Sequence, residues 1–145
     1  MDYLTIMLMS MIPVIELRGA IPIGIASGLD PVYVYIVSVI GSTLVAVPLI
    51  ITFRTILQKL KKNKIFYKIG NKIDHTINNR MKKLRSMTII GIIIYVGVPL
   101  PTTGSWTASA IASVLRMRIK DALAGVLLGN MLAGTIVSFL TFHIV

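Results

Sequence analysis

The sequence predicts an all-α integral membrane protein with two inverted halves, each a re-entrant helical hairpin followed by one transmembrane helix. Three observations lead to this fold class. The chain is 55% hydrophobic and 14% charged, with a mean hydropathy of +0.85, whereas soluble domains carry about a quarter charged residues. Four apolar regions follow one another, and two of them are interrupted by prolines. Most of the positive charge is confined to one stretch between the second and third regions.

The 145 residues are predicted to form a single membrane domain with three parts. We assign residues 1–53 to the first half, 54–87 to a basic linker and 88–145 to the second half. Eleven of the fifteen Lys and Arg residues lie within residues 54–85, which carry a net charge of +10. A basic cluster beside apolar spans marks the cytoplasmic side. We therefore expect the linker to be cytoplasmic, and we expect no nucleic-acid partner.

The first apolar region, residues 3–29, is broken by prolines and charged residues: Pro13, Glu16, Arg18, Gly19 and Pro22 lie within "MIPVIELRGAIP". A proline removes a backbone donor and disfavours helix in the residue before it. We therefore expect no regular helix between Pro13 and Pro22. The arms on either side, residues 3–12 and 19–29, would each reach about 15 Å, which is half of a ~30 Å hydrocarbon core.

The second and fourth regions are predicted to span the membrane. Residues 32–53 and 122–144 are nearly free of charge, and each would be about 33 Å long as a helix. The later region contains three glycines that allow close helix contact, Gly125, Gly129 and Gly134.

The third region, residues 88–115, is interrupted by "GVPLPTTGSW" at residues 97–106, which contains Pro99, Pro101 and Gly104. Glycine permits the positive φ that a chain reversal needs. The arms, residues 88–98 and 105–115, are again only long enough to reach the midplane. Each broken region is therefore either one kinked span or a hairpin that turns back at the midplane.

The distribution of charge favours hairpins. If all four regions spanned, the linker and the second basic cluster, "RMRIK" at residues 116–120, would face opposite sides. With two hairpins both clusters face the cytoplasm. The halves then become inverted copies, and "IAS" recurs at residues 25–27 and 111–113. Inverted repeats with broken helices are a recurrent transporter architecture, with the site where the breaks meet.

The linker has apolar residues at helical spacing, namely Ile65, Ile69, Ile73, Ile77, Met81 and Leu84. Lys and Arg fill the other faces. This pattern predicts a basic amphipathic helix on the anionic cytoplasmic leaflet. Its simplest role is a connector that fixes topology, and the alternative is lipid sensing.

Glu16 and Arg18 are the first candidates for a substrate and proton site, because charges inside a membrane usually have a function. Arg18 keeps its charge and needs a partner, a phosphate or water, whereas Glu16 can take up a proton. A substrate that binds Arg18 would break the pair and allow that uptake. The alternative is a structural salt bridge that pins the hairpin tip.

The second break supplies hydroxyl groups from Thr102, Thr103, Ser105 and Thr107. A helix beginning at about residue 105 would offer backbone donors to an anionic group. In the hairpin alternative, Trp106 packs against the substrate path or the other hairpin. In the kinked-span alternative it is an interfacial anchor. Asn130, with Ser42 at the matching place in the first half, either bonds between helices or lines the path.

Enzyme chemistry, metal sites and cofactors are not expected. The chain has no cysteine, and its two histidines lie in different segments, which makes a metal site unlikely to form. Glu16 is the single acid inside an apolar region, so a catalytic dyad or triad lacks a second partner.

Three segments carry a resemblance to a known family: "PVIELRGAIPIGIASG" at residues 13–28, "PLPTTGSWTASAIASVLRM" at 99–117 and "LGN" at 128–130. They resemble the signature segments of the small multi-drug export protein family, which is distantly similar to DedA-type membrane proteins. The family resemblance implies export, with Glu16, Arg18 and the prolines of the second break as motif residues. The DedA likeness implies two re-entrant hairpins and proton-dependent movement of lipids such as phosphorylated carrier lipids. Its pattern favours an arginine in the second hairpin, where this chain has only Arg116, beyond the tip.

These observations together predict a multi-pass cell-membrane transporter for proton-coupled export of amphipathic small molecules through a midplane site between the hairpins. One alternative is a DedA-like lipid flippase or scramblase, and another is a structural or accessory membrane subunit. The expected partners are the bilayer, an amphipathic substrate or phospholipid, and a second copy. A 145-residue unit has little protein with which to bury a midplane ion pair, so we expect a homo-oligomer, most simply a dimer.

Overall fold

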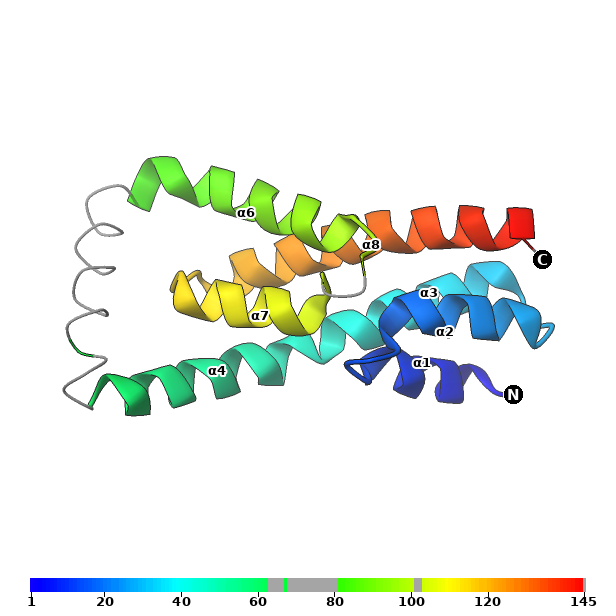
Figure 1. The fold of residues 1–145 in the computed structure, drawn as a ribbon, viewed down its shortest axis with the longest axis horizontal. Coiled ribbons are helices and arrows are strands. Elements are labelled where there is room, and N and C mark those ends of the chain that lie inside the picture. The colour runs from blue at the N-terminus through cyan, green and yellow to red at the C-terminus, as the bar shows by residue number, and fades with distance from the viewer. Residues whose placement is uncertain (63–66, 68–80, 101–102, 145) are drawn as a thin grey trace.

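The computed structural model describes residues 1–62, 67, 81–100 and 103–144. Within these ranges the chain forms seven helices and no strand (Figure 1), which confirms the predicted all-α class. Two helices are long and apolar enough to cross a membrane, Pro31–Leu60 with 30 residues and Ile119–Ile144 with 26. They contain the predicted spans.

The first apolar region forms two short helices, α1 (Tyr3–Met11) and α2 (Glu16–Ala26), which pack against each other. Residues 12–15 make the turn between them. Helix α1 ends because Pro13 disfavours helical geometry in the preceding residue, and Ile12 is extended, with a ψ of 131°. The break therefore lies where the first proline predicts it.

The expectation that no regular helix exists between Pro13 and Pro22 is wrong over its second part, because α2 begins at Glu16 and includes Pro22. Pro22 lacks only the N–H that would bond the Arg18 carbonyl. The buried face of the helix, with Leu17 and Ile21, packs into the core and compensates for that one missing bond.

The first long helix has two parts, α3 (Pro31–Leu44) and α4 (Ala46–Lys61). The Asp30 carboxylate accepts hydrogen bonds from the N–H groups of Val32 at 2.9 Å and Tyr33 at 3.4 Å, which caps the start of α3. The helix is interrupted at Val45 because Pro48 has no N–H for the Leu44 carbonyl. The helix continues beyond residue 53, so residues 54–61 of the predicted linker belong to α4.

The second half repeats the order of a broken region followed by a long helix. Its helices are α6 (Met81–Gly97), α7 (Ser105–Val114) and α8 (Ile119–Ile144). Of the predicted amphipathic linker helix, Met81 and Leu84 lie in α6. Ile65, Ile69, Ile73 and Ile77 lie outside the described residues.

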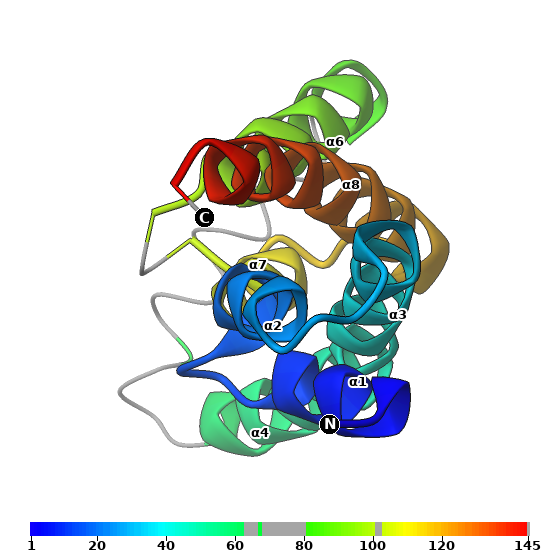
Figure 2. The same ribbon diagram turned by 90° about the vertical axis from the view of Figure 1, so that its right-hand side faces the viewer.

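Two helix pairs, α1 with α2 and α6 with α7, approach the centre of the molecule from opposite ends (Figure 1). Helix α1 runs inward from the end that holds the N-terminus and α2 returns there, whereas α6 runs inward from the other end and α7 returns to that end. Helices α2 and α7 lie nearly in line, with their N-termini facing each other at mid-length (Figures 1 and 2). The ends of α4 and α7 and the start of α8 share one end of the molecule.

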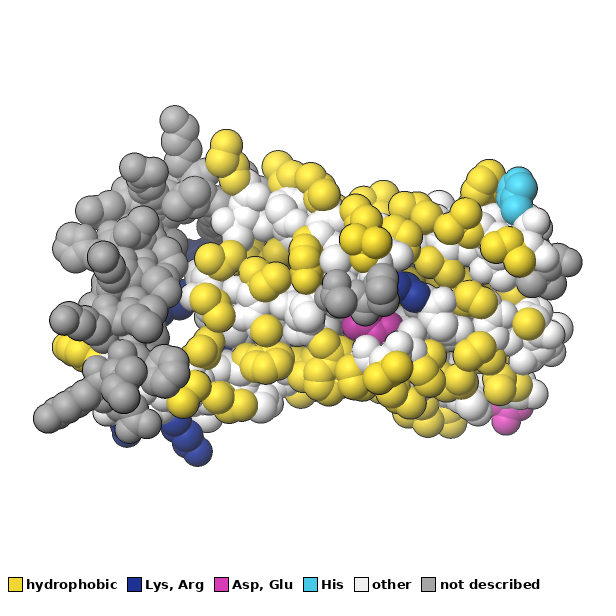
Figure 3. Space-filling model, viewed as in Figure 1, with side chains coloured by type: hydrophobic (Ala, Val, Ile, Leu, Met, Phe, Trp, Pro, Cys, Tyr) yellow, Lys and Arg dark blue, Asp and Glu magenta, His cyan; other side chains and the backbone are white. Residues whose placement is uncertain are grey.

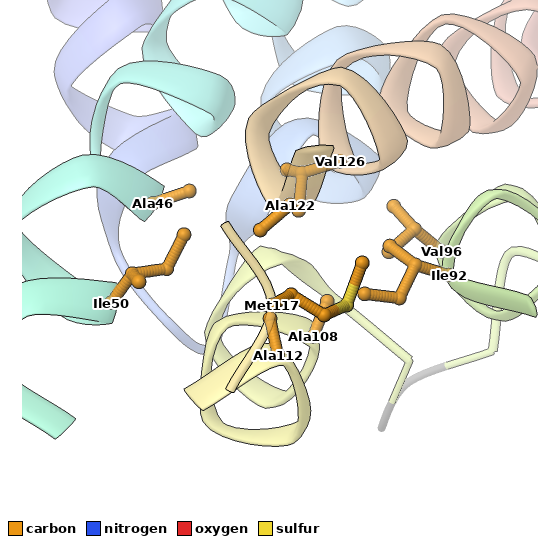
Figure 4. Packing of buried hydrophobic residues seen from close by; sticks show 9 residues of the cluster. All are labelled: Ala46, Ile50, Ile92, Val96, Ala108, Ala112, Met117, Ala122 and Val126. Carbon is orange, nitrogen blue, oxygen red and sulfur yellow. The ribbon is translucent and has the colours of Figure 1, made fainter. Parts of the chain in front are cut away.

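Two clusters of buried apolar side chains hold the helices together. One joins α1, α2, α3 and α8, and the other joins α4, α6, α7 and α8 (Figure 4). Glycine allows the close contact between α6 and α8, because a Cβ at Gly129 would lie 2.6 Å from the Val96 Cβ. Gly125 meets Ile92 and Gly134 meets Tyr35 in the same way, so all three predicted glycines lie at helix contacts.

Candidate functional site

Glu16 is the first residue of α2, and its carboxylate lies on the second break. Its side chain is 8% exposed, and its backbone φ is +46°. The carboxylate accepts hydrogen bonds from the backbone N–H groups of Ser105 and Trp106, the first two residues of α7. It lies so close to Gly104 that a Cβ there would overlap both carboxylate oxygens. Glu16 thus caps a helix far from it in the sequence.

This contact gives partners to the first backbone N–H groups of α7 and places a negative charge at the positive end of the helix dipole. The first N–H groups of a helix have no partner within it, and the helix dipole favours an anion there. The sequence suggests that the start of α7 would receive an anionic group. In this structure that group is the protein's own Glu16.

Arg18 binds the other side of the same break. One guanidinium nitrogen, Nη1, lies 3.2 Å from the Glu16 Oε2. The other, Nη2, donates to the carbonyls of Val96 at 3.1 Å and Val98 at 3.3 Å, at the end of α6. It also donates to the Thr103 carbonyl and, at 3.1 Å, to the Thr103 hydroxyl. A cation at a helix C-terminus satisfies carbonyls that lack partners.

Thr103 supports this arrangement from within the second break. Its hydroxyl donates to the Val98 carbonyl at 2.6 Å and accepts from the Leu100 N–H at 3.3 Å. It therefore holds the end of α6 in a tight turn beside the guanidinium. The structure brings this predicted residue to Arg18, whereas Thr102 and Pro101 lie outside the described residues.

The contact between the two breaks is reciprocal. Trp106 of α7 donates its indole N–H to the carbonyl of Met11, the last residue of α1, at 3.2 Å. The indole therefore contacts the end of α1, in the first apolar region. Each break supplies a side chain that satisfies a helix end in the other. We call Glu16, Arg18, Thr103, Gly104 and Trp106 the junction.

Asn130 lies beside the junction in a buried polar cluster. The side chain is 1% exposed and its amide donates to the hydroxyls of Thr43 at 3.0 Å and Ser105 at 3.1 Å. The Ser105 and Ser42 hydroxyls are 3.0 Å apart. The cluster therefore links α3, α7 and α8, and Asn130 bonds between helices.

The remaining predicted tip residues shape the backbone. Pro13 is exposed in the first turn and Pro99 lies in the second. Gly19 in the first turn of α2 has no room for a side chain, because a Cβ would lie 2.7 Å from the Ile15 Cγ2. Pro22 is displaced from the break into α2.

Sequence reasoning missed some members of this site. Thr43 was not predicted as a site residue, and Ser105 was predicted only as one of the hydroxyl groups of the second break. Ser105, Ser109 and Ser113 recur every four residues and so share one helix face. The carbonyls of Met11, Val96 and Val98 leave no signal in the sequence, because any residue carries one. Among the described residues, no group of three His, Cys, Asp or Glu could hold a metal ion.

A comparison with protein families finds one described as "Putative small multi-drug export protein", which matches residues 16–136. No curated protein and no solved structure matches the chain. The matched range begins at Glu16, the first residue of α2, and includes the second break and most of α8. The likeness to DedA-type proteins is not shown by these comparisons.

Proposed function

We propose that this chain, which belongs to the small multi-drug export protein family, is an integral membrane protein. Its proposed function is the export of amphipathic small molecules. Two helices of 30 and 26 residues with high hydropathy support the membrane location. So do the many large apolar side chains on the surface of the described part of the molecule, which Figure 3 shows. In water such a surface would drive aggregation.

In this proposal the pairs α1 with α2 and α6 with α7 are re-entrant hairpins of inverted halves. Helices α1, α2 and α7 have 9, 11 and 10 residues and are therefore about 14 to 17 Å long, half of a bilayer core. The basic end of α4 and the basic residues Arg116, Arg118 and Lys120 lie at one end of the molecule (Figure 1). The positive-inside rule makes this end cytoplasmic.

The observation that carries the function is the cross-capping at the junction. Two half-helices, α2 and α7, direct their N-termini toward the centre, and Glu16 lies between them. Facing half-helix N-termini in transporters bind anionic groups of substrates. Here an internal carboxylate holds the position, together with the guanidinium of Arg18.

This arrangement suggests how export could be coupled to protons. An anionic group of a substrate competes with Glu16 for Arg18 and for the N–H groups of α7. Once displaced, the carboxylate is released from its cation, and it is the group of the pair that can take up a proton. Arg18 keeps its charge throughout.

The experiment is proton flux in liposomes that contain the purified protein, after addition of cationic or anionic amphiphiles. The variants are Glu16→Gln and Arg18→Gln, and the control is Asp30→Asn, which removes an acid at the far end of the molecule. We expect substrate-dependent flux in the wild type and the control, and none in Glu16→Gln. Arg18→Gln should reduce the proton flux that an anionic amphiphile induces more than the flux that a cationic one induces.

Thermal unfolding in detergent shows which variants are folded, and only these are interpreted. Equal flux in the wild type and a folded Glu16→Gln would mean that the ion pair of Glu16 and Arg18 has a structural role only, as in an accessory membrane subunit. Flux that requires Glu16 with cationic amphiphiles only would mean that the substrate binds the carboxylate itself. In that case the competition for Arg18 would be wrong.

A further inference from the structure

We propose that the groove between α6 and α7 binds one acyl chain of an anionic phospholipid, with its headgroup at the basic end of the molecule. This inference rests on the membrane location proposed above, and it does not depend on transport. It concerns a bound lipid outside the junction.

The groove exists because the arms of the second hairpin diverge. Helix α6 packs mainly on α8, and α7 packs mainly on α4, with little contact between α6 and α7. In the first hairpin, by contrast, α1 and α2 pack directly on each other. The space between the diverging arms has a volume of about 330 Å³, within the range of small-molecule pockets.

The lining of the groove is apolar. Its walls include Met87, Gly91, Ile92 and Tyr95 from α6, and Ile111 and Leu115 from α7. Ile92 is 3% exposed and forms the floor, as part of the buried cluster in Figure 4, whereas Met87 at the rim is 67% exposed. An apolar channel that is open along the lipid-facing side suits a hydrocarbon chain.

The α7 wall of the groove ends in positive charge, because Arg116 follows Leu115 directly. Arg118 and Lys120 are exposed just beyond, with Asp121 as the one acid in that segment. Basic residues near a membrane surface attract anionic headgroups. This charge selects an anionic lipid over a zwitterionic one.

Gly91 provides the test, because a Cβ at this position meets nothing within 4 Å. Gly91→Trp and Gly91→Leu would fill the groove without a clash in the fold. Gly91→Ala is the matched control, because it improves helix propensity while adding only a methyl group. Arg118→Gln combined with Lys120→Gln removes headgroup charge and leaves the groove intact.

The measurement is lipid retention by detergent-purified protein, read by native mass spectrometry after incubation with phosphatidylglycerol or with phosphatidylcholine of the same chains. We expect the wild type and Gly91→Ala to hold one phosphatidylglycerol, and the two filled variants to bind it at least tenfold more weakly. The wild type should prefer phosphatidylglycerol, and the Arg118 and Lys120 double variant should lose that preference.

Equal retention by Gly91→Ala and by both filled variants would overturn the proposal, since the lipid would then be bound elsewhere. Equal retention of the two lipids by the wild type would overturn the role of the basic end. Glu16→Gln leaves the groove unchanged, so it should retain the lipid even if it abolishes export. A failure of this inference is therefore distinguishable from a failure of the proposed function.

Discussion

At the scale of single residues, Gly104 has to be glycine because the Glu16 carboxylate occupies the space of a side chain. Its φ of −123° is one that any residue adopts. Glycine is therefore required at this position for lack of space and not for its backbone conformation. The residue type at position 104 in the second half thus depends on the Glu16 carboxylate in the first half.

Gly104→Ala should lower the free energy of unfolding by about 1 to 3 kcal/mol, as expected for overpacking. Gly91→Ala is the control, because it has no neighbour to displace. The measurement is thermal unfolding of both variants in the same detergent. If the two glycine variants were equally stable, Glu16 would not lie on Gly104.

A second prediction at this scale compares two buried serines one turn apart on α3. Ser42 bonds the Ser105 hydroxyl at 3.0 Å, whereas the Ser38 hydroxyl has no hydrogen-bond partner. Both side chains are fully buried. Ser42→Ala should cost about 1 kcal/mol, and Ser38→Ala should cost nothing or stabilise. Unfolding measurements that gave both variants the same stability would contradict the polar cluster.

At the scale of helices, the junction joins a guanidinium to the end of α6 and a carboxylate to the start of α7. These charges complement both helix dipoles. Arg18 reaches Glu16 and the α6 carbonyls together because its planar fork carries several donors. A lysine has one compact charged group and cannot bridge both.

Arg18→Lys should therefore loosen the start of α7 although the positive charge is kept. The readout is the fluorescence of Trp106, which is the one tryptophan in the chain and whose indole bonds the end of α1. We expect a red-shifted emission maximum, as the indole gains water. Lys62→Arg is a control at the exposed end of α4, and its spectrum should match the wild type. An unshifted spectrum in Arg18→Lys would mean that the guanidinium does not hold the break.

The sequence predicts the helices better than their mutual contacts. Prolines and the length of apolar runs set the breaks, so α1 and α7 end within about a residue of the arms they predict. Pro22 predicts a helix break that does not occur, because the cost of one proline inside a helix is offset by burial of its neighbours. Glu16 and Arg18 stand out as charges in an apolar run, but their partners are backbone groups some 80 residues away. Because every residue has a backbone carbonyl, no pattern of residue types could predict these contacts.

At the scale of the whole molecule, the basic end of α4 and the segment 116–120 lie at one end, and the N-terminus lies at the other (Figure 1). This geometry makes a prediction about membrane sides, because four spanning regions would put the end of α4 and residues 116–120 on opposite sides. The chain has no cysteine, so single introduced cysteines can report the side directly.

Lys62→Cys and Arg118→Cys should both react with an impermeant thiol reagent from the cytoplasmic side in inside-out vesicles. Ser27→Cys, exposed near the N-terminus, should react from the other side. All three are exposed residues, so the substitutions should leave the fold intact. Labelling of Lys62→Cys and Arg118→Cys from opposite sides would replace the hairpins with kinked spans.

The cross-capping of the two breaks also has a consequence for synthesis of the protein. Glu16 and Arg18 leave the ribosome long before Val98, Thr103 and Trp106, which lie 80 to 95 positions later than their partners. Until then, the first hairpin carries an ion pair and open helix ends that lipid cannot satisfy. The nascent chain should therefore wait at the membrane surface or inside the insertion machinery. The two halves are then expected to enter the bilayer as one unit rather than in order of translation.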